Sequence, residues 1–155
     1  MSKQLEYRIS KNNDQSVSIL LTGFIDELTR EVLFRLKGEL PESLVSVSID
    51  TSGIARISSI GIAHYSAFVK SLKNVNITYR ACSVVFMDFL SMLPAVKGDA
   101  RVESFYGSYF CERCDDEFSL LVRTEDVENS QSSTCPGCRE IAKATGHLED
   151  KIHGF

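Results

Sequence analysis

Four of the five cysteines are spaced so that together they could bind one metal ion. Cys111 and Cys114 form one C-x-x-C pair, Cys135 and Cys138 form a second, and 20 residues separate the two pairs. A two-residue gap lets one tight turn present two sulfurs to a single ion, and two such turns complete a tetrahedral four-thiolate Zn2+ site. Because four thiolates leave no open coordination position, the expected zinc is structural rather than catalytic.

Two other uses of these cysteines stay open. A pair of disulfides would need an oxidising compartment, whereas the polar segment over residues 1–11 is unlike a secretory signal. A redox-active dithiol is expected beside a βαβ unit, and neither cysteine pair lies in one. Within the second pair, Gly137 is expected to adopt a positive φ and Pro136 to stiffen the turn.

The remaining cysteine and the three histidines point to no further chemistry. Cys82 ends an expected buried strand, which predicts a small core residue rather than a reactive thiol. His64 is expected to face solvent or a partner. His147 and His153 follow the second cysteine pair and are expected at the surface, although either could supplement the metal. The sequence contains no recognisable nucleophile, base and acid set and no glycine-rich phosphate loop, so we do not expect an enzyme.

A serine-bearing segment over residues 50–62, DTSGIARISSIGI, is the second stretch with chemical potential. Asp50–Gly53 is expected to form a turn, and Ser58 or Ser59 is expected to cap a helix that begins near Ile60. A helix start collects free backbone N–H groups and a partial positive charge. A phosphate on such a serine would therefore be stabilised locally.

Residues 1–107 resemble the STAS domain, the family of bacterial anti-sigma factor antagonists and of the tails of sulfate transporters. Three short motifs carry the resemblance: LTGFID at Leu21–Asp26, DTSGI at Asp50–Ile54 and SSIGI at Ser58–Ile62. The family form of the last two is an Asp-x-Ser loop followed by Asp-Ser-Ser/Thr-Gly-Leu. The resemblance implies a non-catalytic signalling module with a protein partner.

The resemblance also implies roles for individual residues. In the antagonists the first serine of Asp-Ser-Ser-Gly is phosphorylated, and this position corresponds to Ser59. Ser58 stands where the family has an aspartate and Ile60 where it has a second hydroxyl residue, so phosphorylation of Ser59 and plain helix capping both stay open. The partner-binding surface is expected to include Asp26, Ser58, Ser59, Ile60 and Gly61, although Asp26 could instead cap the first helix.

The implied partner is an anti-sigma factor, a kinase-like regulator or a larger sensory assembly in the bacterial cytoplasm. The chain has 155 residues and a formal net charge of −4, which argues against nucleic acid as the partner. No apolar run reaches the ~18–20 residues that span a bilayer, so membrane insertion is not expected. Two alternative functions are a zinc-ribbon adaptor that contacts nucleic acid or the transcription machinery, and a STAS component of small-ligand or lipid-transport systems.

An α/β fold with a mixed sheet and helices packed on it is expected to position these groups. Strands joined through helices imply parallel pairing by right-handed crossovers, and an opening hairpin adds an antiparallel edge. We expect two domains, a STAS-like domain over residues 1–107 and a zinc-ribbon segment over 108–155. The polar stretch over 123–134 is expected to be an exposed excursion. The expected elements are a hairpin over 5–21, helices over 26–40, 60–72 and 83–93, and strands over 44–49, 75–81, 101–106 and 118–122.

Overall fold

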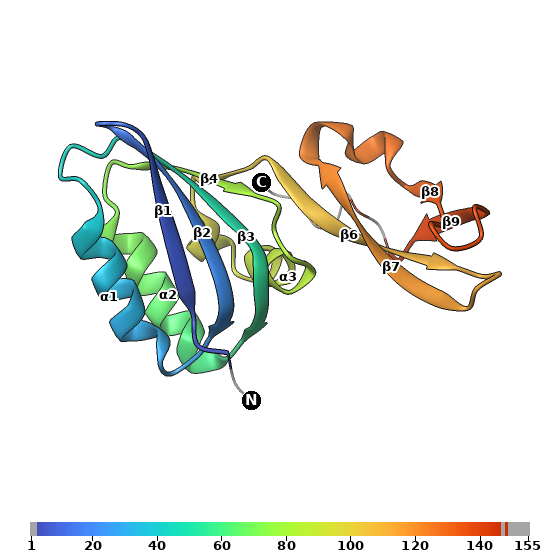
Figure 1. Cartoon of the computed structure of the whole chain (residues 1–155), viewed down its shortest axis with the longest axis horizontal. Coiled ribbons are helices and arrows are strands. Elements are labelled where there is room, and N and C mark those ends of the chain that lie inside the picture. The colour runs from blue at the N-terminus through green and yellow to red at the C-terminus, as the bar shows by residue number, and fades with distance from the viewer. Residues whose placement is uncertain (1–2, 147, 149–155) are drawn as a thin grey trace.

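Two β-sheets that meet at the start of one long strand organise the molecule (Figure 1). The computed structural model describes residues 3–146 and 148. The first sheet has five strands in the order β1-β2-β3-β4-β5. Its elements are β1 (Glu6–Asn13), β2 (Ser16–Ile25), α1 (Thr29–Glu39), β3 (Ser46–Ile57), α2 (Ser59–Ser71), β4 (Asn76–Arg80), α3 (Val84–Met92), α4 (Pro94–Lys97) and β5 (Arg101–Val102).

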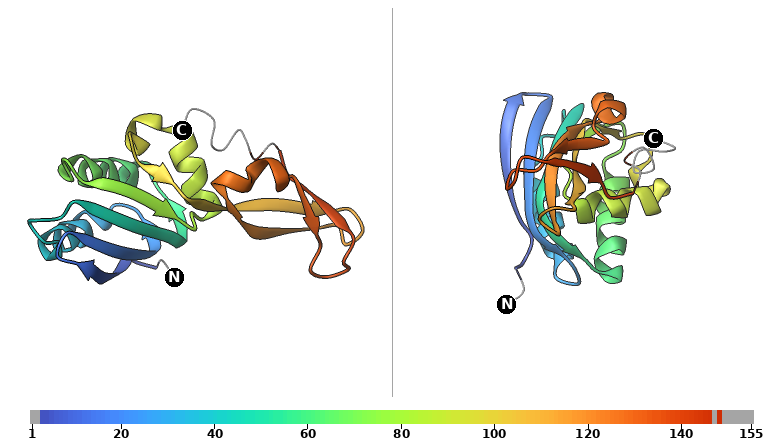
Figure 2. Two further views of the ribbon diagram at one scale, coloured as in Figure 1. Left: turned by 90° about the horizontal axis from the view of Figure 1, so that it is seen from above. Right: turned by 90° about the vertical axis from the view of Figure 1, so that its right-hand side faces the viewer.

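The predicted α/β class is confirmed, as a mixed sheet with helices packed on it and a small C-terminal element that carries the cysteine cluster. β1 pairs antiparallel with β2, whereas β2, β3, β4 and β5 pair in parallel. Along β2, Val17, Ile19 and Leu21 are fully buried, and the residues between them are half-buried. This alternation shows that the helices cover one face of the sheet (Figure 2) and leave a more polar face open.

β3 is longer than predicted, because the expected turn at Asp50–Gly53 does not form. The chain stays extended through Ile57, and the pairing of β2 with β3 shifts register between Leu20 and Thr22. The N–H of Ser52 donates to the carboxylate of Asp50 at 2.9 Å. The side-chain hydrogen bond that suggested a turn therefore supports a bulge within a continuous strand.

Serine side chains begin two of the helices as predicted. The hydroxyl of Ser58 accepts the N–H of Gly61 at 3.1 Å, and that of Ser83 accepts the N–H of Phe86 at 3.1 Å. The prediction that Asp26 caps the first helix is wrong. Its carboxylate accepts the N–H of Leu28 in a turn before α1, and no side-chain hydrogen bond caps the helix itself.

The second sheet has the strand order β7-β6-β9-β8 and lies beyond β5. The predicted strand over residues 101–106 is divided between the two sheets, and Gly107, expected to end it, lies inside β6. The expected division at residue 107 therefore falls within a strand. The elements are β6 (Ser104–Cys111), β7 (Asp116–Arg123), the 3-10 helix η1 (Thr124–Asn129), β8 (Ser132–Thr134) and β9 (Ile141–Ala144).

The polar stretch over 123–134 is mostly exposed, as predicted, but it forms ordered structure. η1 turns within it and buries Val127, which is 6% exposed, while β8 pairs with β9. Burying one apolar side chain and pairing a short strand hold this segment against the second sheet. A composition-based prediction misses such a single anchor.

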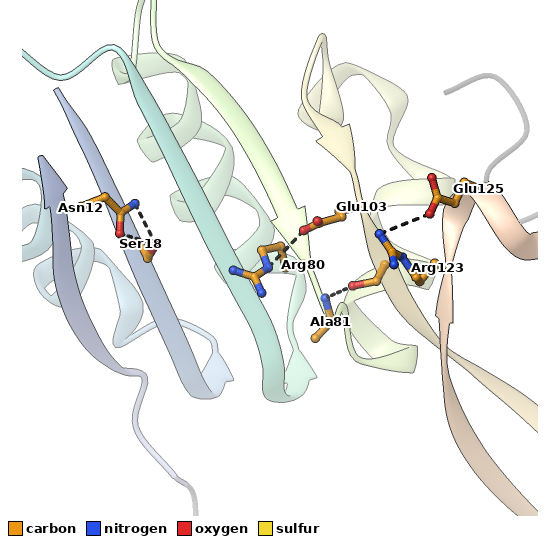
Figure 3. Close-up of polar contacts among 8 residues, drawn as sticks. Asn12, Ser18, Arg80, Ala81, Glu103, Arg123 and Glu125 are labelled. Atoms are coloured by element: carbon orange, nitrogen blue, oxygen red, sulfur yellow. Dashed lines mark hydrogen bonds and ion pairs between the residues drawn. The ribbon is translucent and has the colours of Figure 1, made fainter.

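Hydrogen bonds from both sheets converge where β6 begins. The N–H of Ala81 donates to the hydroxyl of Ser104 at 2.8 Å (Figure 3). Cys82 exchanges backbone hydrogen bonds with Ser104 and Tyr106. Ala81 has a φ of 48°, a left-handed conformation that this contact helps to hold. One apolar core runs from the first sheet through Phe105 into the second. Among the described helices, none is long and apolar enough to span a bilayer.

Candidate functional site

The four predicted metal ligands come together at the far end of the second sheet. Cys111 ends β6, Cys114 lies in the turn to β7, and Cys135 and Cys138 lie in the loop between β8 and β9. All four sulfurs lie within 4.8 Å of one another. The Sγ atoms of Cys111 and Cys138 are 3.5 Å apart, and those of Cys114 and Cys135 are 3.9 Å apart.

These distances fit one tetrahedral ion. Four sulfurs about 2.3 Å from a shared Zn2+ would lie about 3.8 Å from one another. The same distances are far longer than the roughly 2.05 Å of a disulfide bond. The four cysteines are therefore close enough to bind a metal ion, and their donor set is the one that structural zinc sites use.

The two cysteine turns share one backbone conformation at the residue after their second cysteine. The residue directly after each second cysteine adopts a left-handed conformation, Asp115 with a φ of 51° and Arg139 with a φ of 65°. The prediction for Gly137 is wrong, because the positive φ lies at Arg139 instead. A Cβ on Gly137 would lie 3.8 Å from two of the sulfurs, so this glycine lines the cluster without strain. Both left-handed residues directly follow a C-x-x-C pair, and this shared position in the sequence was the signal that could have identified them.

Without a metal ion, the thiols of Cys135 and Cys114 differ in pKa. The backbone N–H groups of Cys138 and Gly137 point at the sulfur of Cys135 and lower its pKa to about 7. The neighbouring sulfurs, that of Cys138 first, raise the pKa of Cys114 to about 12. Several adjacent thiolates repel one another, and a divalent cation among them removes that repulsion.

An ion pair that the sequence analysis missed joins the two cysteine turns. Arg113 lies between the first two cysteines, and its guanidinium contacts the carboxylate of Glu140 at 2.9 Å. Both side chains are more than half exposed, so the pair contributes little energy by itself. Arg123 is likewise paired, with Glu125 at 3.2 Å (Figure 3). Acidic neighbours thus offset the basic residues of this element, which weakens the case for nucleic acid.

The residues predicted to bind a partner gather where β2 and β3 end and α2 begins. Gly61 sets their spacing, because a Cβ there would lie 2.1 Å from the carbonyl oxygen of Ile25. The N–H of Ser58 also donates to that carbonyl at 2.9 Å. This close approach brings Asp26, the residue after Ile25, beside the first turn of α2.

Three side chains at this end, which we call the serine end, are open to solvent, whereas Asp26 and Ser58 are half-buried. The serine end comprises Asp26, Leu28 and residues 58–61. Ser59 is exposed, Ile60 is 56% exposed and Leu28 is 53% exposed. An exposed leucine and an exposed isoleucine next to a free hydroxyl are features of contact surfaces more than of helix ends that serve only folding. α1 begins only at Thr29, so Leu28 lies before the helix and stays exposed.

Arg56 precedes the serine end by two residues in the chain. The guanidinium of Arg56 stands 5.9 Å from the ring centroid of Phe24, at the end of β3. α2 has no acidic residue in its first turn. The positive end of the helix dipole at the start of α2, with no carboxylate in the first turn, suits an anion on Ser59.

The other candidate residues have simpler places. Cys82 is fully buried, and burial raises the pKa of its thiol to about 12, in agreement with the predicted core role. His64 is half-buried between α1 and α2 rather than fully at the surface. His147 and His153 lie outside the described residues.

Comparison with known proteins finds structural likeness but no match in sequence families. No protein-family model and no curated protein matches the chain. Among solved structures, the chain is similar to an anti-sigma factor antagonist from Mycobacterium paratuberculosis, with 14% sequence identity and a TM-score of 0.47. The alignment covers 64% of this chain and 85% of that one.

Proposed function

We propose that this protein is a non-catalytic regulatory module that binds a protein partner through the serine end. The observation that carries the proposal is the exposure of Ser59 and Ile60 beside Asp26, on a helix start fixed by Gly61. The STAS-like motifs LTGFID and SSIGI support a partner of the anti-sigma factor or kinase-like class, or a larger sensory assembly. The bacterial cytoplasm is the proposed location.

Phosphorylation of Ser59 is the proposed switch. A phosphate adds about −1.5 to −2 charges. The first turn of α2 would stabilise it, while the same charge would repel and desolvate an acidic partner seated against Ile60 and Leu28. The hydroxyl of Ser58 is already used to cap α2, which leaves Ser59 as the modifiable serine.

The test uses the full chain loaded with zinc and the purified kinase-fold anti-sigma factors of its own organism. We expect at least one of them to bind, Ser59→Asp to weaken that binding about tenfold or more, and Ser59→Ala to bind like wild type. Ser10→Asp is the matched control, because Ser10 is an exposed serine on β1, away from the start of α2. Equal affinities for Ser59→Asp, Ser10→Asp and wild type would refute the switch, and absence of any binding would refute the partner class.

Zinc at the four cysteines is the second part of the proposal. The spacing of the four sulfurs, which suits one tetrahedral ion, supports a structural zinc. We expect elemental analysis to find one zinc per chain, lost in Cys114→Ser and retained in Cys82→Ala, whose cysteine is buried elsewhere in the core. Iron in place of zinc, or metal that survives Cys114→Ser together with Cys138→Ser, would contradict it.

A further inference from the structure

A groove between α1 and α2 is the feature of this molecule that the proposed switch leaves unexplained. The two helices lie side by side on the covered face of the first sheet (Figure 1). A hollow of about 330 Å3 lies between them. Its lining comes from both helices: Arg30, Leu33, Phe34, Lys37, His64, Ala67, Phe68 and Ser71.

The α1–α2 groove has an apolar floor, and the phenyl ring of Phe34 is exposed at its side. Leu33 and Phe68 are buried, at 3% and 5% exposure, so they form the floor. Phe34 stands 81% exposed on the outer side of α1. The short side chain of Ala67 keeps the space above Phe68 open. An exposed ring beside an apolar floor forms a patch of the kind that marks contact sites.

The charges around the α1–α2 groove are of one sign. Arg30 and Lys37 line it together with His64, and no carboxylate lines it among the described residues. None of the ion pairs found within residues 3–146 involves Arg30. The ammonium of Lys37 donates to the hydroxyl of Ser71 at 3.1 Å and so closes one end of the groove. This cationic lining stands out in a chain whose formal net charge is −4.

We infer that the α1–α2 groove binds an amphipathic helix of a protein partner, with an apolar stripe flanked by glutamate or aspartate. The apolar stripe would cover Phe34 and pack on Leu33 and Phe68, in the helix-in-groove mode that uses residues at i, i+3, i+4 and i+7. The acidic flank would pair with Arg30. Small-molecule sites bury about 70–90% of their ligand, and a groove whose wall residue is 81% exposed does not enclose one.

This docking site differs from the serine end and needs no phosphate. The groove residues His64 and Ala67 follow the first turn of α2, whereas Ser59 begins it. A partner could engage both, yet each can be disabled separately. Failure of one proposal therefore leaves the other standing.

The experiment uses the zinc-loaded full chain and three synthetic helical peptides of about 18 residues, or five turns. The peptides share one leucine stripe and differ only in their flanks, which are glutamate, glutamine or lysine. Binding is followed by amide chemical shifts and by fluorescence anisotropy. We expect the glutamate peptide to bind most tightly and to shift the amides of Arg30, Phe34 and Ala67.

Two variants and one matched control locate the binding. Arg30→Glu and Phe34→Ala should each weaken binding of the glutamate peptide about tenfold, as loss of a central contact does. Arg35→Glu is the control, because Arg35 lies on the same helix but faces Tyr7 of β1 instead of α2. All three side chains are exposed or half-exposed, so unchanged melting temperatures are expected and will show that the variants fold.

Each other outcome overturns the inference. Equal binding of the three peptides, or equal weakening by Arg35→Glu, would remove the charge argument. Absence of any peptide binding would refute the docking mode. Saturable binding of palmitate at Phe34 would identify a small apolar anion as the occupant, and a dimer that Phe34→Ala dissociates would identify a second copy of this chain.

Discussion

Two glycines in helices differ in whether the fold has room for a side chain at their positions. Gly61 and Gly38 both lie in helices that cover the first sheet, although only Gly61 belongs to a motif that the sequence analysis singled out. Their surroundings differ completely. A Cβ on Gly61 would overlap the backbone of β2, whereas a Cβ on Gly38 would meet nothing within 4 Å. Gly61 therefore fixes the serine end, and Gly38 is replaceable.

A pair of alanine substitutions tests this contrast. We expect Gly61→Ala to destabilise the protein by about 1–3 kcal/mol or more, because backbone atoms must move apart. Gly38→Ala should stabilise it by about 0.5–1 kcal/mol, since alanine loses less conformational freedom in a helix. Denaturant unfolding of both variants measures the difference. Similar unfolding free energies for the two would show that α2 does not pack closely on Ile25.

The elements of the first sheet were largely predictable, and the reasons lie in their patterning. Serine caps at Ser58 and Ser83 and the parallel strand order followed from local signals. The bulge at Asp50 was not predictable, because the same side-chain hydrogen bond can serve a turn or a continuous strand. The late start of α1 was missed because the carboxylate of Asp26 accepts the N–H of Leu28 in a turn before the helix, while the hydroxyl of Thr29 accepts the N–H of Asp26.

The cysteine element shows a second limit of prediction. The spacing of four cysteines predicted their convergence, which the sulfur distances confirm as compatible with one ion. The fold of the polar stretch between the pairs depended on one buried side chain, Val127, and on pairing with β9, which no local pattern encodes. Contacts with distant parts of the chain, rather than local secondary-structure propensity, therefore determine the fold of this stretch.

Removal of metal is expected to act on the elements that the cysteines hold. Without an ion, the loop between β8 and β9 keeps little apolar burial, whereas β1, β2 and β3 keep their core. We expect a chelator to collapse the amide spectrum of β8, β9 and the turn at Cys114 and to leave that of β2 and β3 unchanged. Hydrogen exchange with and without chelator checks this. A single cooperative loss of both sheets would contradict it.

At the scale of the whole molecule, the two sheets share one core. The apolar cluster runs from Leu5 in the first sheet to Leu148, and Phe105 lies between them with no exposed surface. Division of the chain near residue 107 therefore describes composition and motif, while packing continues across it.

Truncation of Phe105 tests that continuity. We expect Phe105→Ala to cost about 3–5 kcal/mol, because it opens a cavity between the sheets that neither can fill. Phe34→Ala is the matched control and should change stability by less than about 0.5 kcal/mol, since its ring is already in solvent. Calorimetry of both variants measures the two effects. A small cost at Phe105 would mean that the sheets are energetically independent.

The placement of β6 has a mechanical consequence. β6 is hydrogen-bonded to Cys82 near its start and ends at Cys111, one of the four predicted metal ligands, and no loop interrupts it. We therefore expect a displacement of the cysteine turns, by a bound protein or by loss of the ion, to act on the loop that joins β4 to α3.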